Sequence, residues 1–141
     1  MMTERIHSIM TKNVLTLSPN HTAADVNEIV KSKRYHHIPI VEGSKMVGIV
    51  TSYDLMRMDV PVAKYADHRI KDFMTTHVAY LNPNDQIGAA AELFMKHLFH
   101  GLPICDDDLN LVGIITTHDV LKYTYYKEYP REVPQQAVHS N

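Results

Sequence analysis

Two threonine–aspartate pairs are the side chains of this sequence whose types and spacing are best suited to chemistry. Thr51 and Asp54 follow one short apolar run, and Thr116 and Asp119 follow another. At the start of a helix, such a pair forms a capping box that satisfies the first free N–H groups. The same geometry can hold a nucleotide. A helix N-terminus attracts phosphate, a hydroxyl donates to a phosphate oxygen, and a carboxylate accepts hydrogen bonds from a ribose diol. Taken alone, the motif favours capping over ligand binding.

The two pairs stand at equivalent places in an internal repeat. The segment from Ile6 to Arg57 recurs from Ile70 to Lys122, with an offset of 64 residues that becomes 65 after the turns at 42–45 and 106–110. Each copy is marginal as an independent core, so we expect the copies to pack on each other and share an interior. Such pairing creates a cleft with approximate two-fold symmetry, in which two equivalent sites could lie.

Composition is that of a soluble globular protein. The chain has 141 residues, of which 45% are hydrophobic and 21% charged, and its formal net charge of −2 does not favour nucleic-acid binding. No apolar run approaches the roughly 18 residues that span a bilayer, and the N-terminus lacks the apolar region of a signal peptide. The single cysteine, Cys105, excludes an intramolecular disulfide and is expected to be buried and inert. We expect a cytoplasmic protein that binds neither membranes nor nucleic acids.

Each copy is predicted to contain the same elements in the same order. They are a short helix (6–10 and 70–74), an extended segment ending before a proline (14–17 and 78–81), an amphipathic helix (from near 22, and around 87–94), a hairpin (38–41 with 46–50, and 102–105 with 111–115) and a last helix. Pro39 and Pro103 cannot donate ladder hydrogen bonds, so each is expected at a strand start or edge. Gly48 and Gly113 would permit close approach of backbone or ligand.

Histidines and aspartates raise the alternative of a metal site. The nearest candidates are His97 with His100 and the adjacent His36 and His37, but a zinc site needs three or four converging ligands, so we expect none. The three aspartates at 106–108 lack the glycine and the terminal glutamate of a calcium loop.

Repeated motifs give the chain a family resemblance. In both copies the same four motifs follow one another: I-x-x-I/F-M-T, V-x-x-L-x-P, H-x-h-P-I, where h is hydrophobic, and G-h-h-T-x-x-D. Over about residues 4–124 the chain resembles a tandem pair of CBS domains (cystathionine-β-synthase-type repeats), often called a Bateman module. The resemblance implies an α+β fold of two pseudo-symmetric βαββα-type repeats, each a small sheet covered by helices. It also implies an adenosine-containing ligand in the cleft, such as AMP, ADP, ATP, S-adenosylmethionine or NAD.

The same resemblance assigns roles to individual residues. Asp54 and Asp119 would hold ribose hydroxyls, and Thr51 and Thr116 would meet ribose or phosphate. The remaining ligand-binding residues are Val14, Thr16, Ile38 and Pro39 in the first site and Val78, Tyr80, Leu102, Pro103 and His118 in the second. Candidates for phosphate contacts are Arg34, His36 and Arg57 near the first site and His97, His100, His118 and Lys122 near the second.

The two sites are expected to be unequal, and their histidines to respond to pH. His37 aligns with Gly101, and Tyr53 aligns with His118, so bulk at His37 could narrow the first site where Gly101 opens the second. Because histidines gain charge as pH falls toward about 6, we expect phosphate to bind more tightly at pH 6 than at pH 8.

These observations predict a regulatory module rather than an enzyme. Residues 1–62 form the first repeat (core 6–57), 63–69 the linker, 70–124 the second repeat and 125–141 a partly disordered tail whose start continues the last helix. We expect a sensor of adenosine-containing nucleotides without a cofactor or metal. The alternative is a ligand-free dimerisation scaffold.

A homodimer would use helices near 55–58 and 120–125, with Met56, Met58, Tyr123, Tyr125 and Tyr126 exposed. Because no catalytic domain is attached, the output would pass through a partner protein.

Overall fold

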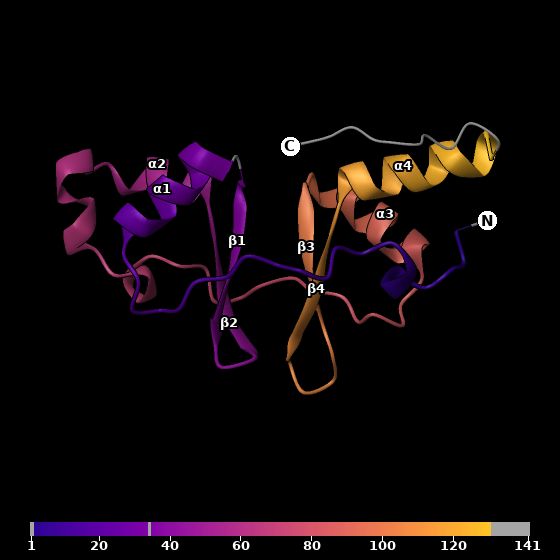
Figure 1. The fold of residues 1–141 in the computed structure, drawn as a ribbon, viewed down its shortest axis with the longest axis horizontal. Helices are drawn as coiled ribbons and strands as arrows, with labels where there is room; N and C mark the ends of the chain where they lie inside the picture. The colour runs from indigo at the N-terminus through magenta and orange to yellow at the C-terminus, as the bar shows by residue number, and fades with distance from the viewer. Residues whose placement is uncertain (1, 34, 131–141) are drawn as a thin grey trace.

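The computed structural model describes residues 2–33 and 35–130, which form two similar halves side by side (Figure 1). The first half contains the helices α1 (Ala23–Lys33) and α2 (Ser52–Met58) and the strands β1 (His37–Glu42) and β2 (Lys45–Thr51). The second half contains α3 (Ile87–His97), α4 (Thr117–Glu128), β3 (Gly101–Cys105) and β4 (Leu111–Thr116). Three 3₁₀ helices complete the described chain: η1 (Ile6–Ser8), η2 (Val62–Asp67) and η3 (Ile70–Asp72).

Most of the predicted elements are confirmed. Both hairpins form antiparallel two-stranded sheets, and the amphipathic helices begin at Ala23 and Ile87. The short first helices are single 3₁₀ turns. The extended segments do not form continuous strands, because each contacts its hairpin through one parallel bridge, Leu17 to Ile40 or Leu81 to Ile104. Pro39 and Pro103 lie inside strands, which a two-stranded sheet tolerates since each strand is an edge.

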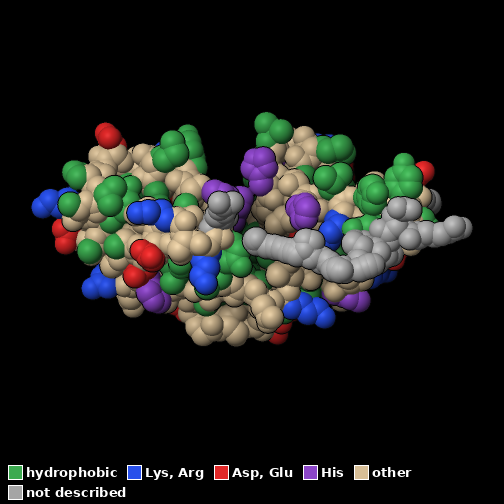
Figure 2. Space-filling view, turned by 45° about the horizontal axis from the view of Figure 1, so that its top comes forward, with side chains coloured by type: hydrophobic (Ala, Val, Ile, Leu, Met, Phe, Trp, Pro, Cys, Tyr) green, Lys and Arg blue, Asp and Glu red, His purple; other side chains and the backbone are tan. Residues whose placement is uncertain are grey.

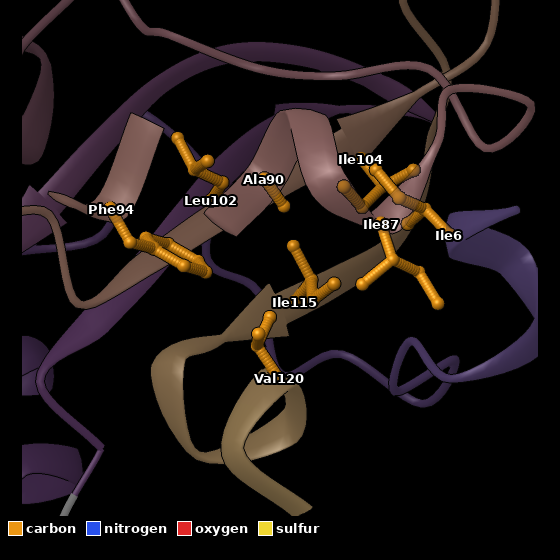
Figure 3. Close-up of a cluster of buried hydrophobic side chains, with 8 residues drawn as sticks. All are labelled: Ile6, Ile87, Ala90, Phe94, Leu102, Ile104, Ile115 and Val120. Carbon is orange, nitrogen blue, oxygen red and sulfur yellow. The ribbon is translucent and has the colours of Figure 1, made fainter. Parts of the chain in front are cut away.

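The two copies share an interior by exchanging their leading segments. Ile6, from the first copy, is fully buried among side chains of the second copy, and Figure 3 shows it beside Ile87 and Ile104. Ile70, from the second copy, is fully buried in the core of the first. Each core therefore needs a segment that the sequence repeat assigns to the other copy. The core that contains Ile6 comprises Ile6, Ile87, Ala90, Phe94, Leu102, Ile104, Ile115 and Val120.

Backbone pairing fixes this exchange. Thr11 and Ile114 each donate an N–H to the other's carbonyl oxygen at 2.9 Å, and Thr75 and Ile49 do the same at 3.0 and 2.9 Å. Six residues after Thr11, Leu17 pairs with β1 of its own copy. Each extended segment therefore starts on the other copy's hairpin and ends on its own, which carries it across the space between the halves.

The hairpin turns join the halves at the end opposite the helices (Figure 1). The Leu111 N–H donates to the Ser44 carbonyl oxygen at 2.9 Å, and the Met46 N–H donates to that of Leu109 at 3.0 Å. The Lys45 ammonium also donates to the Asp108 carbonyl oxygen at 2.6 Å. Because the tips are tied together, space between the halves opens at the helix-bearing end.

The linker and the last helix contain further regular structure. The 3₁₀ helix η2 spans most of the predicted linker, and its Tyr65 packs against the core of the first half. Helix α4 continues past residue 124 to Glu128. Residues 131–141 of the predicted tail lie outside the described residues. No helix within residues 2–33 and 35–130 is long and apolar enough to cross a membrane.

Gly48 and Gly113 lie where the exchanged segments press against the hairpins. A Cβ at Gly48 would lie 2.7 Å from Met74 Sδ and 2.9 Å from the Thr75 carbonyl oxygen, and one at Gly113 would lie 2.6 Å from Met10 Sδ. Such separations are below van der Waals contact. Both glycines thus permit close approach of backbone, not of a ligand.

We predict that Gly48→Ala and Gly113→Ala each lower the free energy of unfolding by about 1–3 kcal/mol, because the added methyl group forces the exchanged segment off its hairpin. Gly101→Ala is the matched control, since its Cβ would find ordinary contacts at 3.7 Å. Urea denaturation of the three variants measures the effect. A loss of stability as large for Gly101→Ala as for the other two would contradict this account.

Candidate functional site

Both threonine–aspartate pairs form capping boxes. The Asp54 Oδ2 atom accepts hydrogen bonds from the Thr51 N–H at 2.8 Å and the Thr51 hydroxyl at 3.2 Å, and Thr51 Oγ1 accepts from the Asp54 N–H at 3.2 Å. Thr116 and Asp119 repeat these contacts at 2.8, 3.0 and 3.1 Å. The structural interpretation of the motif is confirmed. Capping engages only Oδ2 of each carboxylate, so Oδ1 is left for another partner.

A cavity of about 850 Å³ lies between the halves, beside the two boxes. This volume is within the range of small-molecule sites. Thr51 and Thr116, the threonines of the two boxes, line it. So do residues of the extended segment around 11–15, which crosses from the second hairpin to the first and is called the crossing segment below. The complete lining is Thr11, Asn13, Val14, Leu15, Tyr35, His36, His37, Thr51, Ser52, Tyr53, Leu98, Phe99, His100, Ile114 and Thr116. The arrangement combines an apolar wall, aromatic rings, hydroxyl groups and imidazoles, which suits a planar polar ligand with an anionic group.

Three histidines, His36, His37 and His100, line this cavity, and Figure 2 shows histidine side chains gathered where the cleft opens. The rings of His37 and His100 lie 6.5 Å apart. Burial lowers the pKa of His37, and the nearby His100 and His36 lower it further, whereas the Asp54 carboxylate opposes the change. His37 therefore favours the neutral form.

His37 and Gly101 are neighbours rather than walls of two separate sites. A Cβ at Gly101 would lie 3.8 Å from His37 Nδ1. His37 and Gly101 are the first residues of β1 and β3, so equivalent positions of the two repeats meet there. The histidine of one copy occupies space beside the glycine of the other.

Comparison with known proteins decides the family. A family model described as CBS domain matches residues 6–60 and again residues 70–126. The chain belongs to the CBS domain family. The exchanged halves described above are therefore a tandem pair of CBS repeats.

Relatives and solved structures agree with this assignment. The CBS domain-containing protein YhcV of Bacillus subtilis is 30% identical over 115 residues, covering 82% of this chain and 81% of that protein. Protein MJ0188 of Methanocaldococcus jannaschii is 29% identical over 134 residues, 94% of this chain, but the chain spans only about half of that protein, 48%. The solved CBS domain pair of protein MJ0100, in complex with 5′-methylthioadenosine and S-adenosyl-L-methionine, has a TM-score of 0.74 and 25% identity. The structural match covers 89% of this chain and 98% of the MJ0100 chain.

The structure gathers some of the predicted site residues and separates others. Val14, Thr51, Thr116, His36 and His100 line the large cavity. Ile38 and Leu102 are buried in the two cores, and Pro39 and Pro103 are buried with them. Thr16, Val78, Tyr80, His97 and His118 do not line this cavity, and Arg34 lies outside the described residues.

The predicted carboxylates and cations lie in two different environments. Asp54 is buried, and Arg57 Nη2 lies 3.6 Å from its Oδ1 atom. Asp119 and Lys122 instead line a second cavity of about 450 Å³ between η1 and α4. Its other lining residues are Glu4, Ser8, Ile9, Tyr123, Tyr126 and Lys127, with Lys127 in an ion pair with Glu4 at 2.7 Å.

Sequence reasoning missed several residues of the large cavity. Thr11, Asn13 and Leu15 come from the crossing segment, and Tyr53 and Ser52 lie inside the first motif. The repeated Met-Thr pair at the start of each copy was a signal for Thr11. The pairing of Thr11 with Ile114 of the other copy could not be predicted, because no sequence pattern within one copy indicates which hairpin its leading segment pairs with.

The remaining reactive groups do not enter the site. Cys105 is buried, and burial together with the charge of Asp106 raises the pKa of its thiol to about 11. The expectation of a buried thiol is confirmed, and a protonated thiol is a poor nucleophile. Within the part of the chain that the structure describes, no three histidine, cysteine, aspartate or glutamate side chains are grouped to hold a metal ion.

We predict that acid destabilises the protein partly through His37. Because its pKa is lowered from 6.5 in the folded state, the unfolded chain binds more protons as pH falls through 6.5, and folding stability decreases. His37→Gln should lose less free energy of unfolding than the wild type between pH 7.5 and pH 5.5 in urea denaturation. His77→Gln, at an exposed histidine that does not contribute to the pKa of His37, is the control. Equal losses in wild type and His37→Gln would rule out this role.

Proposed function

We propose that the chain is a regulatory module whose cleft binds an adenosine-containing nucleotide. The observation that carries the proposal is the cavity of about 850 Å³ lined by the capping threonines of both repeats, Thr51 and Thr116. A purine can lie against the apolar wall formed by Val14, Leu15 and Ile114, while hydroxyl and imidazole groups meet the sugar and phosphate. The related MJ0100 pair, which was solved with adenosine-containing ligands, supports this class of ligand.

The groups in the cleft support binding rather than catalysis. None of the described residues that line the cavity forms a hydrogen-bonded Ser–His or Thr–His pair, the arrangement that activates a hydroxyl nucleophile. We therefore propose that the output of ligand binding is a change in affinity for a partner protein. We propose a cytoplasmic location, where a lone buried thiol such as Cys105 stays reduced.

Exposed apolar residues at equivalent positions support a second proposal, a homodimer. Met56 on α2 and Leu121 on α4 correspond in the repeat, and they are 75% and 67% exposed. A large apolar side chain is thus exposed at the same position of each repeat, and exposed apolar surface is where protein–protein interfaces form. Of the other predicted contacts, Tyr125 is exposed, whereas Met58 and Tyr123 pack partly against the two cores.

We predict that nucleotides stabilise the protein against heat. At about 100 times its Kd, a ligand of the cleft should add roughly 2.7 kcal/mol to the free energy of unfolding. A thermal-shift panel of AMP, ADP, ATP, S-adenosylmethionine and NAD tests this. The double variant His36→Asn/His100→Asn should weaken binding of the phosphate-bearing ligands more than that of the cationic S-adenosylmethionine, with the exposed Lys64→Ala as control.

Substitution of the aspartates is a poorer first test, because Asp→Ala also removes a capping box at a cost of about 1 kcal/mol. If no member of the panel shifts the melting temperature, the ligand proposal fails and the scaffold function is favoured.

We predict that charge on the two helices disrupts the dimer. Met56→Glu/Leu121→Glu should reduce the mass measured by light scattering from that of a dimer to that of a monomer. Val62→Glu, at a 65% exposed apolar residue outside both helices, is the matched control and should keep the dimer. A monomeric wild type, or a dimer that survives the double substitution, contradicts this interface.

A further inference from the structure

The two motifs differ in what occupies the second oxygen of the aspartate. In the first repeat, Arg57 lies one helical turn after Asp54, with Nη2 at 3.6 Å from Oδ1. The guanidinium also lies 5.3 Å over the ring of Tyr53, which holds it beside the carboxylate. The Asp54 side chain is only 8% exposed. Both of its oxygens thus have partners, Thr51 on one and Arg57 on the other.

The second motif has the same residue spacing, but no cation lies beside its aspartate in the way that Arg57 lies beside Asp54. Lys122 is the counterpart of Arg57 and His118 the counterpart of Tyr53. Within the described residues, Lys122 forms no ion pair with Asp119, and the Asp119 Oδ1 atom has no hydrogen-bond partner. Asp119 is half-buried and lines the second cavity, whereas neither Asp54 nor Arg57 lines either of the two cavities described above.

The chemistry of the carboxylate makes this difference decisive. A ribose diol needs a carboxylate oxygen to accept its hydrogens, and capping has already taken one oxygen of each aspartate. At Asp54 a ligand must first displace a guanidinium, which lies within ion-pair distance of Oδ1 and stays charged at any physiological pH. At Asp119 the Oδ1 atom has no such partner among the described residues, and the residue lines a cavity.

Position also favours the second motif. Thr116 lines the large cavity and Asp119 lines the smaller one, so the Thr116–Asp119 box forms part of the wall of both. A base lying against Ile114 and the crossing segment can therefore place its sugar over this box.

We propose that the chain binds a single adenosine-containing ligand, with its ribose on Asp119, and that Arg57 closes the first motif by occupying the carboxylate of Asp54. This inference rests on the proposed function and adds to it the number of ligands and the residue that sets that number. Arg57, offered by the sequence as a phosphate contact, is in this view a residue that excludes ligand from the first motif.

Isothermal titration with AMP, and in parallel with S-adenosylmethionine, tests the proposal. The wild-type chain should bind one molecule of at least one of the two probes. Asp119→Asn should weaken that binding by about tenfold or more, the size expected for loss of a hydrogen bond to a charged group. Arg57→Ala, a change at a 60% exposed side chain, should raise the stoichiometry to two. Arg57→Ala/Asp54→Asn should return it to one.

Matched variants separate the role of Arg57 from a general effect of charge. Lys122→Ala removes the equivalent cation and should not raise the stoichiometry, and Lys64→Ala, on η2, should leave it at one. Arg57→Gln repeats the opening with a smaller change of volume, and circular dichroism checks that each variant is folded.

Each outcome is decisive. Two molecules bound by the wild type, or one molecule still bound by Arg57→Ala and by Arg57→Gln, overturns the inference while leaving the proposed function intact. Unchanged affinity in Asp119→Asn overturns it as well. Absence of binding by the wild type to both probes overturns the inference, and a thermal-shift panel in which no nucleotide raises the melting temperature overturns the proposed function with it.

Discussion

The backbone pairing between Thr11 and Ile114, and between Thr75 and Ile49, is the constraint on which the rest of the structure depends. These two-way hydrogen bonds hold each leading segment against the hairpin of the other copy. They require a strand surface without a side chain, which Gly113 and Gly48 provide. The two cores then close around Ile6 and Ile70, so neither half has a complete interior without a segment from the other. Stability and the geometry of the cleft therefore have the same origin.

The cleft follows directly from this exchange. A segment that starts on one hairpin and ends on the other must cross the space between them, and residues 13–15 do so along the wall of the large cavity. The interlocked hairpin turns hold the far ends together. The site is thus built from both repeats, and a ligand bound there would contact both halves at once. This is a suitable arrangement for a module that reports binding through its shape.

Internal duplication also provides a comparison within one molecule. The capping boxes have nearly the same hydrogen-bond lengths, which range from 2.8 to 3.2 Å in the first repeat and from 2.8 to 3.1 Å in the second. What differs is the residue one turn later, because an arginine held over a tyrosine ring reaches the carboxylate and a lysine beside a histidine does not. Asymmetry between the repeats therefore arises from side chains around a shared backbone motif. The motif itself is equally well formed twice.

Local features of this protein could be predicted from the sequence. The capping boxes, the hairpins and the amphipathic helices are set by residues close together in the chain, and the structure confirms them. Alignment of the copies correctly identified which residues are equivalent, including Thr51 with Thr116 and Met56 with Leu121. It could not say on which copy the segments that begin at Ile6 and Ile70 pack, because either arrangement buries the same two isoleucines. Tertiary structure alone decided that exchange, and with it the burial of Ile38 and Leu102 and the different surroundings of Asp54 and Asp119. The physical reason is that burial and pairing depend on contacts between distant segments, whereas caps and turns depend on neighbours along the chain.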